Sequence, residues 1–106
     1  MNIQIDGTNL EISSKIKDLV ATKLSAKLDR LLPHFNDEIK TAFLHLEKDK
    51  YQIYHAKFDM ALPGKEGNIV ATHEHKIFIS AITGLREQIE KQIKKYKQDK
   101  ANYSLG

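Results

Sequence analysis

The sequence has no cysteine, no tryptophan and only two prolines among its 106 residues. The absence of cysteine excludes disulfides, thiolate metal sites and cysteine nucleophiles, and it favours a reducing, intracellular compartment. Apolar runs are only a few residues long, and the N-terminus lacks the basic head and apolar core of a signal peptide. We therefore expect a cytoplasmic protein that neither spans a membrane nor is secreted by that route.

The common catalytic motifs are also missing. The chain has no G-x-S-x-G elbow, no glycine-rich phosphate loop and no H-E-x-x-H sequence. Asp37 and Glu38 are adjacent, and adjacent carboxylates point in different directions on any regular element. The sequence therefore predicts no enzyme, no cofactor and no small-molecule substrate.

One arrangement of histidines could bind a metal ion. His73 and His75 are two residues apart on a predicted strand, which places both imidazoles on one face, with His45 or His55 as a nearby further ligand. Two surface histidines at the end of a strand give the same pattern and are more frequent. A metal site is therefore kept as an alternative, and the prediction is that the chain has none.

Length and composition predict one domain with one core. The chain has the size of a single domain, and 41% hydrophobic with 29% charged residues is a globular balance. We place the domain at residues 1–98 and expect residues 99–106 to form a polar C-terminal tail.

The first third of the chain predicts a strand and a helix. Ile3-Gln4-Ile5 alternates and stops at Asp6-Gly7, as a short strand that ends in a turn does. Ser13 or Ser14 offers an N-cap oxygen, and Pro33 marks the end of the helix. Between them, apolar residues recur at steps of three and four, at Ile16, Leu19, Val20, Leu24, Leu28 and Leu31.

The rest of the chain predicts three strands and a second helix. Residues 39–46 are rich in strand formers, and the alternating residues 54–62 are joined to 69–72 by a turn-rich loop, as in a hairpin. Helical period returns over 78–96, where Gly84 indicates either a close packing contact or a tolerated loss of stability. The order β-α-β-β-β-α predicts an α+β fold, with a four-stranded sheet and two helices packed on one of its faces. The first two strands can then pair in parallel through the crossover helix.

Positive charge is concentrated in the two predicted helices. Residues 15–30 hold five basic against two acidic residues, and residues 86–100 hold six against three. Because the whole chain carries only +3, the remainder carries −3. A basic face on an acidic body is the pattern expected for a polyanion partner, although solvated helix faces produce charge runs equally often.

Each helix also carries a stripe of long polar side chains. Steps of three and four residues stack side chains along one side of a helix, where lysines and arginines can meet successive phosphates. The stripes are Lys23, Lys27 and Arg30 on the first helix, and Gln88, Lys91 and Lys95 on the last. Lysines whose stems flank a core give the same pattern.

Aromatic residues on the strands offer a second route to nucleic acid. Phe43, Tyr54 and Phe58 could form a platform on which bases stack, but the chain has no RNP-like aromatic motif. For Phe58, packing in the core is the favoured interpretation.

Three strings of the sequence, in this order of elements, resemble one known family. They are residues 3–12, with their glycine, asparagine and Glu-Ile; Leu46-Glu47-Lys48 followed by His55-Ala56; and Ala81-Ile82, Leu85 and residues 91–97. These strings resemble the ribosome hibernation-promoting factor family, and the likeness covers nearly the whole chain. Its members are also called ribosome-associated inhibitor, protein Y or sigma-54 modulation protein.

This resemblance implies a fold like a double-stranded-RNA-binding domain with an added first strand, and no catalysis. Members bind the small ribosomal subunit where messenger and transfer RNA would bind, and keep idle ribosomes out of translation under stress or in stationary phase. They contact 16S rRNA largely through basic residues of the two helices. Carried over by position or by spacing, the expected RNA-binding residues are Lys23, Lys27, Arg30, Lys91, Lys94, Lys95 and Lys97.

The chain departs from the family pattern at several positions. Ile77-Phe78-Ile79 replaces an acidic-hydrophobic-tyrosine run, Thr83 replaces an acidic residue and Gln88 replaces a lysine. Between Lys23 and Phe35 the chain is about one helical turn longer than usual. It also ends soon after the last helix, so we expect a short form without the C-terminal dimerisation domain, which would need a separate partner to pair ribosomes.

Two other functions stay open at this point. A general binder of structured RNA would read shape and phosphate with the same basic helices. A metal protein or enzyme would use the His73 and His75 pair.

Overall fold

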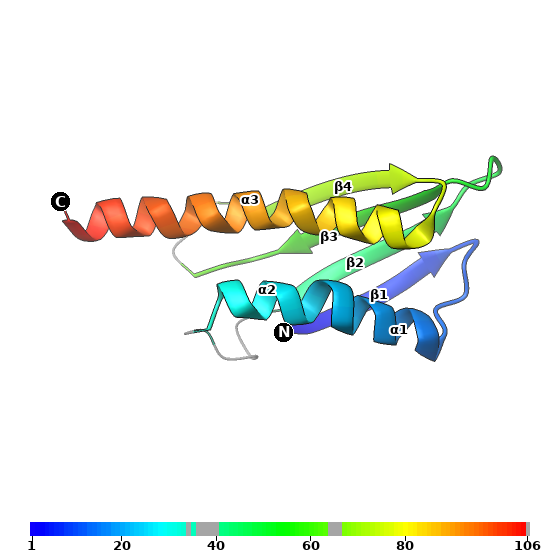
Figure 1. Ribbon diagram of the computed structural model, residues 1–106, viewed down its shortest axis with the longest axis horizontal. Coiled ribbons are helices and arrows are strands. Elements are labelled where there is room, and N and C mark those ends of the chain that lie inside the picture. Colours follow the sequence, from blue (N-terminus) through cyan, green and yellow to red (C-terminus); the bar gives the residue numbers. More distant parts are fainter. Residues whose placement is uncertain (34, 36–40, 64–66, 106) are drawn as a thin grey trace.

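The computed structural model describes residues 1–33, 35, 41–63 and 67–105, and for residues 100–105 it describes the backbone alone. Its elements follow the predicted order β-α-β-β-β-α, so the predicted α+β fold is confirmed (Figure 1). In chain order they are β1 (Asn2–Thr8), a first helix built of α1 (Ser14–Val20), η1 (Ala21–Ser25) and α2 (Ala26–Leu31), then β2 (Thr41–Lys48), β3 (Tyr54–Met60), β4 (Ile69–His75) and α3 (Phe78–Leu105).

The four strands form one mixed sheet in the order β1-β2-β3-β4. β1 pairs with β2 in parallel, as predicted, and the other two pairs are antiparallel. β1 is longer than predicted, because it continues through Gly7 to Thr8 and the turn follows at Asn9, whose φ is 56°. A Cβ on Gly7 would lie 2.5 Å from the carbonyl oxygen of Leu10, so this tight return of the chain requires glycine.

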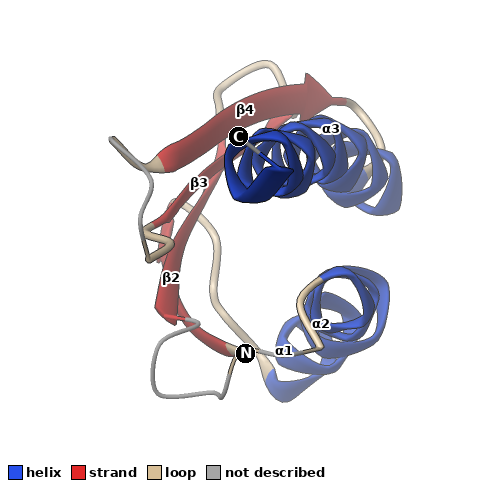
Figure 2. Ribbon diagram, turned by 90° about the vertical axis from the view of Figure 1, so that its left-hand side faces the viewer, coloured by secondary structure: helices blue, strands red, loops and turns tan. Residues whose placement is uncertain are grey.

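Both helices cover the same face of the curved sheet (Figure 2). Phe58 is fully buried, which confirms its predicted place in the core. The side chains between the two layers form one hydrophobic core, whose buried members are Val20, Leu24, Leu28, Leu32, Ala42, Leu44, Leu46, Ala56, Phe58, Met60, Leu62, Ile69, Ala71, Ile82, Leu85, Ile89, Ile93 and Tyr96.

The helices leave the opposite face of the sheet uncovered, and we call it the outer sheet face. Because side chains alternate along a strand, it consists of the residues between the buried ones. Its members are Gln4, Asp6, Thr8, Phe43, His45, Glu47, His55, Lys57, Asp59, Val70, Thr72 and Glu74.

The first helix begins at the predicted cap and contains a widened turn. Ser13 Oγ accepts a hydrogen bond of 3.3 Å from the Ile16 amide, and the helix ends at Leu31, shortly before Pro33. Within it, η1 is a π-helical segment in which the Ala26 amide bonds to the Ala21 carbonyl. The sequence pattern did not predict this segment.

The spacing of the buried residues explains the π-helical segment. Val20, Leu24, Leu28 and Leu32 are buried at steps of four residues. In a regular α-helix each such step turns about 400°, so this row would drift by about 40° per step away from the sheet. The wider turn of η1 offsets that drift and keeps the row pointing into the core.

β4 and α3 meet at a glycine. Ile69 and Ala71 of β4 are buried, and His73 points to the same side. A Cβ on Gly84 would overlap the ring of His73, so of the two interpretations of Gly84 the close packing contact is correct. α3 itself continues to Leu105, through residues expected to form a polar tail, and the division into residues 1–98 and 99–106 stays a prediction.

Some predicted features fall outside the described residues. These are the Asp37-Glu38 pair, the start of the strand predicted at residue 39, and the centre of the loop at residues 64–66. Among the described residues, no helix has the length and apolar character needed to cross a membrane.

Candidate functional site

All seven basic residues predicted to bind RNA are exposed on the helical layer. Lys23 lies in η1, Lys27 and Arg30 in α2, and the other four lie in α3 at Lys91, Lys94, Lys95 and Lys97. The two helices run in the same direction along the sheet (Figure 1), and α3 packs against both η1 and α2. The structure therefore brings both predicted groups to one side of the molecule.

The first helix turns one of its flanks toward β1 and the other toward α3. Lys17, Ala21 and Ser25 line a hollow together with residues 1–5 at β1, which identifies the β1 flank. Lys23 and Lys27 each lie two residues from Ser25 and thus on nearly the opposite side of the helix. These two lysines therefore occupy the flank that faces α3. Arg30, two residues after the buried Leu28, points away from the sheet beside that flank.

α3 likewise has a flank toward β4 and a flank toward the first helix. Gln92 Nε2 donates a 2.9 Å hydrogen bond to the Val70 carbonyl, which identifies the β4 flank. Lys94 is two residues further on, and Lys97 five, so both lie on the flank that faces the first helix. We call Lys23, Lys27, Arg30, Lys94 and Lys97 the inter-helix basic surface.

Lys91 and Lys95 lie elsewhere on α3. Gln88, the first member of the predicted stripe, donates a 3.1 Å hydrogen bond to His73 Nδ1 and is half-buried against β4. Lys95 is seven residues, or two turns, after Gln88 and so shares the β4 flank. Lys91 points away from the sheet, opposite the buried Ile89 and Ile93. Neither lysine is therefore part of the inter-helix basic surface.

The cations of this surface have no ion-pair partner among the residues that the structure describes. Across the described part of the chain, no carboxylate forms an ion pair with any of the seven predicted residues. Arg86 behaves differently, because its Nε lies 3.1 Å from Glu90 Oε1, one turn along α3. Exposed cations without ion-pair partners are suited to binding a polyanion. Arg86 is not one of them, because it is paired with Glu90.

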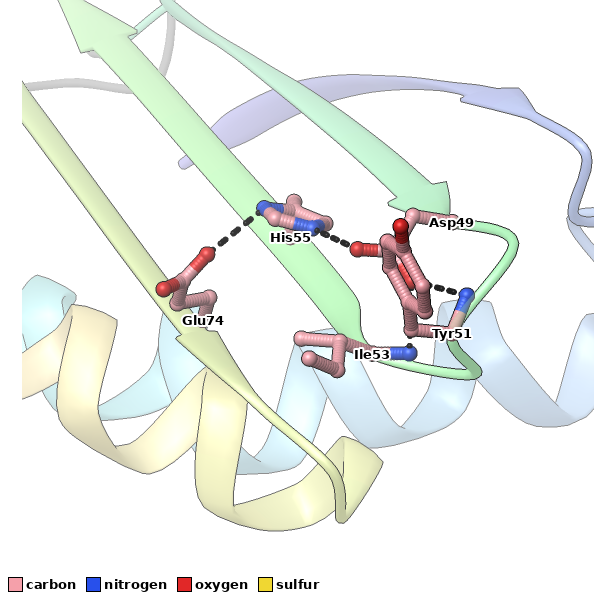
Figure 3. A network of polar contacts seen from close by, with 5 residues as sticks. All are labelled: Asp49, Tyr51, Ile53, His55 and Glu74. Atoms are coloured by element: carbon pink, nitrogen blue, oxygen red, sulfur yellow. Dashed lines mark hydrogen bonds and ion pairs between the residues drawn. The ribbon is translucent and has the colours of Figure 1, made fainter.

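The outer sheet face holds a different set of polar contacts, centred on His55 (Figure 3). His55 Nε2 lies 2.7 Å from Asp49 Oδ2, and His55 Nδ1 lies 3.1 Å from Glu74 Oε2. Asp49 Oδ1 also accepts hydrogen bonds from the Tyr51 and Ile53 amides, at 2.8 and 3.0 Å. The Asp49 carboxylate thus bonds both to backbone amides of the turn between β2 and β3 and to the side chain of His55 on β3.

These contacts shift the pKa values of Asp49 and His55 in the directions that favour an ion pair between them. The hydrogen bond from His55 is the main cause that lowers the pKa of Asp49, followed by the Ile53 amide. The same hydrogen bond is the main cause that raises the pKa of His55, and the charges of Asp49, Glu74 and Glu47 act in the same direction against partial burial. The pair is partly exposed, so solvent screens part of its electrostatic contribution.

The histidines do not assemble as the metal alternative requires. His73 faces α3 and bonds to Gln88, whereas His45 and His55 lie on the outer sheet face, so the expectation that one of them is a nearby further ligand is wrong. His75 Nδ1 accepts a 3.0 Å hydrogen bond from the Ile77 amide near the start of α3. Among the described residues, no group of three or more histidine and carboxylate side chains could hold a metal ion.

The three strand aromatics do not form one platform. Phe58 is in the core, and Tyr54 packs edge-on against Phe78 of α3 with ring centroids 5.4 Å apart. Phe43 lies on the other side of the sheet, where 55% of it is exposed. The base-stacking alternative is therefore wrong, because alternation along the strands separates these rings.

Comparisons with known proteins agree with this fold. The model of the family described as sigma 54 modulation protein / S30EA ribosomal protein matches residues 3–101. A solved structure, the protein Y N-terminal domain of Thermus thermophilus, superposes with a TM-score of 0.75 at 32% identity, covering 91% of this chain and 99% of that one. The comparison with double-stranded-RNA-binding domains stays a prediction.

Two curated relatives carry hibernation names. The ribosome hibernation promoting factor of Pseudomonas putida is 28% identical over 106 residues, which is all of this chain and 96% of the relative. The ribosome hibernation promotion factor of Lactococcus lactis is 33% identical over 98 residues, which is 92% of this chain and 50% of the relative.

Proposed function

The chain belongs to the family of sigma 54 modulation proteins and S30EA ribosomal proteins, a family of ribosome-associated translation regulators, and we propose that it silences ribosomes by binding their small subunit. Hibernation factors are a non-enzymatic class, and we infer that this chain has no catalytic activity. It would act in the cytoplasm, where its ribosomal partner is found.

The proposed binding surface is the helical layer. The inter-helix basic surface would contact phosphates of 16S rRNA in the decoding region, where messenger and transfer RNA would otherwise bind. Lys91 and Lys95 would extend the contact over the outer side of α3. The observation that supports this proposal is that four exposed lysines on the facing flanks of two helices, with Arg30 beside them, have no carboxylate partner in the described part of the chain.

This arrangement suits folded RNA better than a single strand. Lysines and arginines contact phosphates without reading bases, so they position a protein on a shape. Two parallel rows of cations can meet two phosphate backbones at once, as across a groove of an RNA helix. The proposal therefore expects recognition of a particular rRNA surface and little dependence on base sequence.

Co-sedimentation tests the proposal. The protein is incubated with purified small subunits, large subunits or a generic RNA duplex at two salt concentrations, and the bound fraction is measured after centrifugation. Saturable one-to-one binding to small subunits, weakened by salt, is the expected result, because phosphate contacts release counterions. Equal affinity for all three targets would instead favour the general binder of structured RNA, and binding to none would refute both.

A double charge reversal locates the contact. Lys27→Glu with Lys94→Glu changes one residue on each facing flank and should weaken binding to small subunits at least tenfold. Lys50→Glu with Lys57→Glu is the matched control, because it reverses two exposed lysines that lie outside the helical layer. Equal losses for the double variant and the control would contradict the assignment to the helical layer.

A further inference from the structure

The outer sheet face has a charge opposite to that of the helical layer. It carries four carboxylates, Asp6, Glu47, Asp59 and Glu74, against one lysine, Lys57. Its two histidines contact two of these carboxylates, His45 at Asp6 and His55 at Glu74. The sheet separates this surface from the basic helices (Figure 2), so an anion such as RNA is repelled from it.

Strand pairing arranges this face in three rows across the sheet. The end rows are anionic, whereas in the middle row Lys57 offsets Asp6. From one end to the other the rows are Gln4, Phe43, Asp59 and Val70; then Asp6, His45, Lys57 and Thr72; then Thr8, Glu47, His55 and Glu74.

The first row combines an exposed ring with a carboxylate. Phe43 is 55% exposed and Val70 46% exposed, and Asp59 lies between them in the register. Asn68 Nδ2 donates a 2.6 Å hydrogen bond to Asp59 Oδ1, which holds that carboxylate in place. Asp6 lies one row away, with 78% of its side chain exposed and its Oδ1 2.7 Å from His45 Nδ1.

Two shallow hollows connect these rows. One, of about 300 Å³, is lined by Gln4, Asp6, Phe43, His45, Lys57 and Asp59 among others. The other, of about 310 Å³, is lined by His45, Glu47, His55, Lys57, Thr72 and Glu74 among others. Both include His45 and Lys57, so the two hollows lie side by side, one over the first and middle rows and the other over the middle and third rows. We call the two hollows together the trough.

We propose that this trough binds an arginine-rich, extended segment of another protein. A guanidinium can stack on the ring of Phe43 while it pairs with Asp59 or Asp6, and arginine suits such a site better than lysine because it is planar and weakly hydrated. The inference goes beyond RNA binding and does not depend on it, because the surface lies on the other side of the sheet.

The spacing of the rows defines the segment. Phe43 and Glu47 are four residues apart on β2, which corresponds to about 13 Å along an extended chain. One arginine would occupy the first row at Phe43 and Asp59, and a second, four residues along the peptide, would reach Glu47 and Glu74. The residues between them would pass over Lys57, which disfavours a further cation there.

Nuclear magnetic resonance with a synthetic peptide tests this proposal. The probe is a nine-residue glycine-serine peptide with two arginines four positions apart, titrated into the isotopically labelled full chain. We expect shift changes in Phe43, Glu47 and Asp59 and none along α3. The same peptide with both arginines replaced by glutamine should give no shifts.

Variants make the test specific. Phe43→Ala and the pair Asp6→Asn with Glu47→Gln should each weaken peptide binding at least fivefold, and Lys91→Gln, on the helical layer, should leave it unchanged. The amide spectrum of each variant shows whether it is folded. Unchanged peptide affinity in the folded Phe43 and acidic variants would overturn the proposal.

Other occupants would give different results. Shifts on the outer sheet face caused by an RNA duplex in place of the peptide would assign the face to nucleic acid. Concentration-dependent shifts there without any peptide would assign it to the basic helices of a second copy. Either outcome, or no shift with millimolar peptide, would refute the arginine-rich partner.

Discussion

The imidazole of His73 lies against the backbone of Gly84, where no Cβ could be accommodated without moving the ring. The same imidazole accepts a hydrogen bond from Gln88, one turn further along α3. A single side chain of β4 thus contacts α3 at two positions that are one helical turn apart.

Gly84→Ala should lower the free energy of unfolding, although alanine is the better helix former. The methyl group would displace the ring and break its bond to Gln88, and overpacking of this kind costs about 1 to 3 kcal/mol against a propensity gain of about 1 kcal/mol. Urea denaturation measures the difference. Combining it with His73→Ala should recover most of the loss, and strictly additive losses would argue against contact between the two sites.

Lys94→Glu with Lys97→Glu should weaken binding to small subunits more than Lys91→Glu with Lys95→Glu does. Both pairs change the net charge equally, but only the first removes cations from the flank that faces the first helix. For the first pair, the slope of the logarithm of the binding constant against the logarithm of the salt concentration should become shallower by the equivalent of about two phosphate contacts. Equal effects of the two pairs would show that net charge, and not the inter-helix basic surface, determines binding.

The His55 and Asp49 pair should make stability depend on pH in a defined window. The pKa of His55 is raised above its usual 6.5, so its contribution is complete below that value and is lost as the pH rises through the higher folded pKa. The pKa of Asp49 is lowered below its usual 3.8, so its contribution is present above that value and is lost as the pH falls through the lower folded pKa. The pair therefore stabilises the fold most between these two usual values.

Comparing Asp49→Asn with the natural chain at several pH values checks this dependence. The stability difference between the two proteins should be larger at pH 5 than at pH 8, as measured by urea denaturation. Because the difference is taken at each pH, titration of the other histidines cancels. A difference that does not change between these values would show that His55 and Asp49 do not titrate as a pair.

Thr22→Val should destabilise the π-helical segment. Thr22 lies in η1, and its Oγ1 donates to the Asp18 carbonyl at 3.0 Å and lies 3.3 Å from the Leu19 carbonyl, both in the preceding turn of α1. Loss of the hydroxyl should cost about 0.5 to 1.5 kcal/mol in thermal or urea unfolding. Thr22→Ser keeps the hydroxyl and should retain most of the stability, so a similar loss in both variants would point to packing and not to the hydrogen bond.

Local patterns were sufficient to predict most of the fold. The period of the apolar residues predicted both helices, and alternation along residues 54–62 predicted which side of β3 is buried. The π-helical segment was missed because steps of four residues also fit an α-helix over short distances. The contact of His73 with Gly84 joins residues far apart along the chain, so only tertiary packing could decide between the two interpretations of that glycine.

The sequence predicted which residues of the candidate site are exposed cations, but it did not predict how they are arranged relative to one another. Helical spacing identified the exposed cations, but which flank of α3 faces the first helix depends on contacts such as Gln92 with β4. The outer sheet face was missed because its rows combine residues from four strands. Strand register, which places Phe43 opposite Asp59, cannot be obtained from one strand's sequence alone.

The bond from Gln92 to the Val70 carbonyl has a further consequence for the molecule in a crowded solution. β4 is the last strand of the sheet, and its free backbone groups could template a strand from a neighbouring chain. The Gln92 amide occupies one of these groups from within the same molecule. α3 thereby occupies one backbone acceptor of this edge strand, which makes that carbonyl a poorer partner for a strand of another chain.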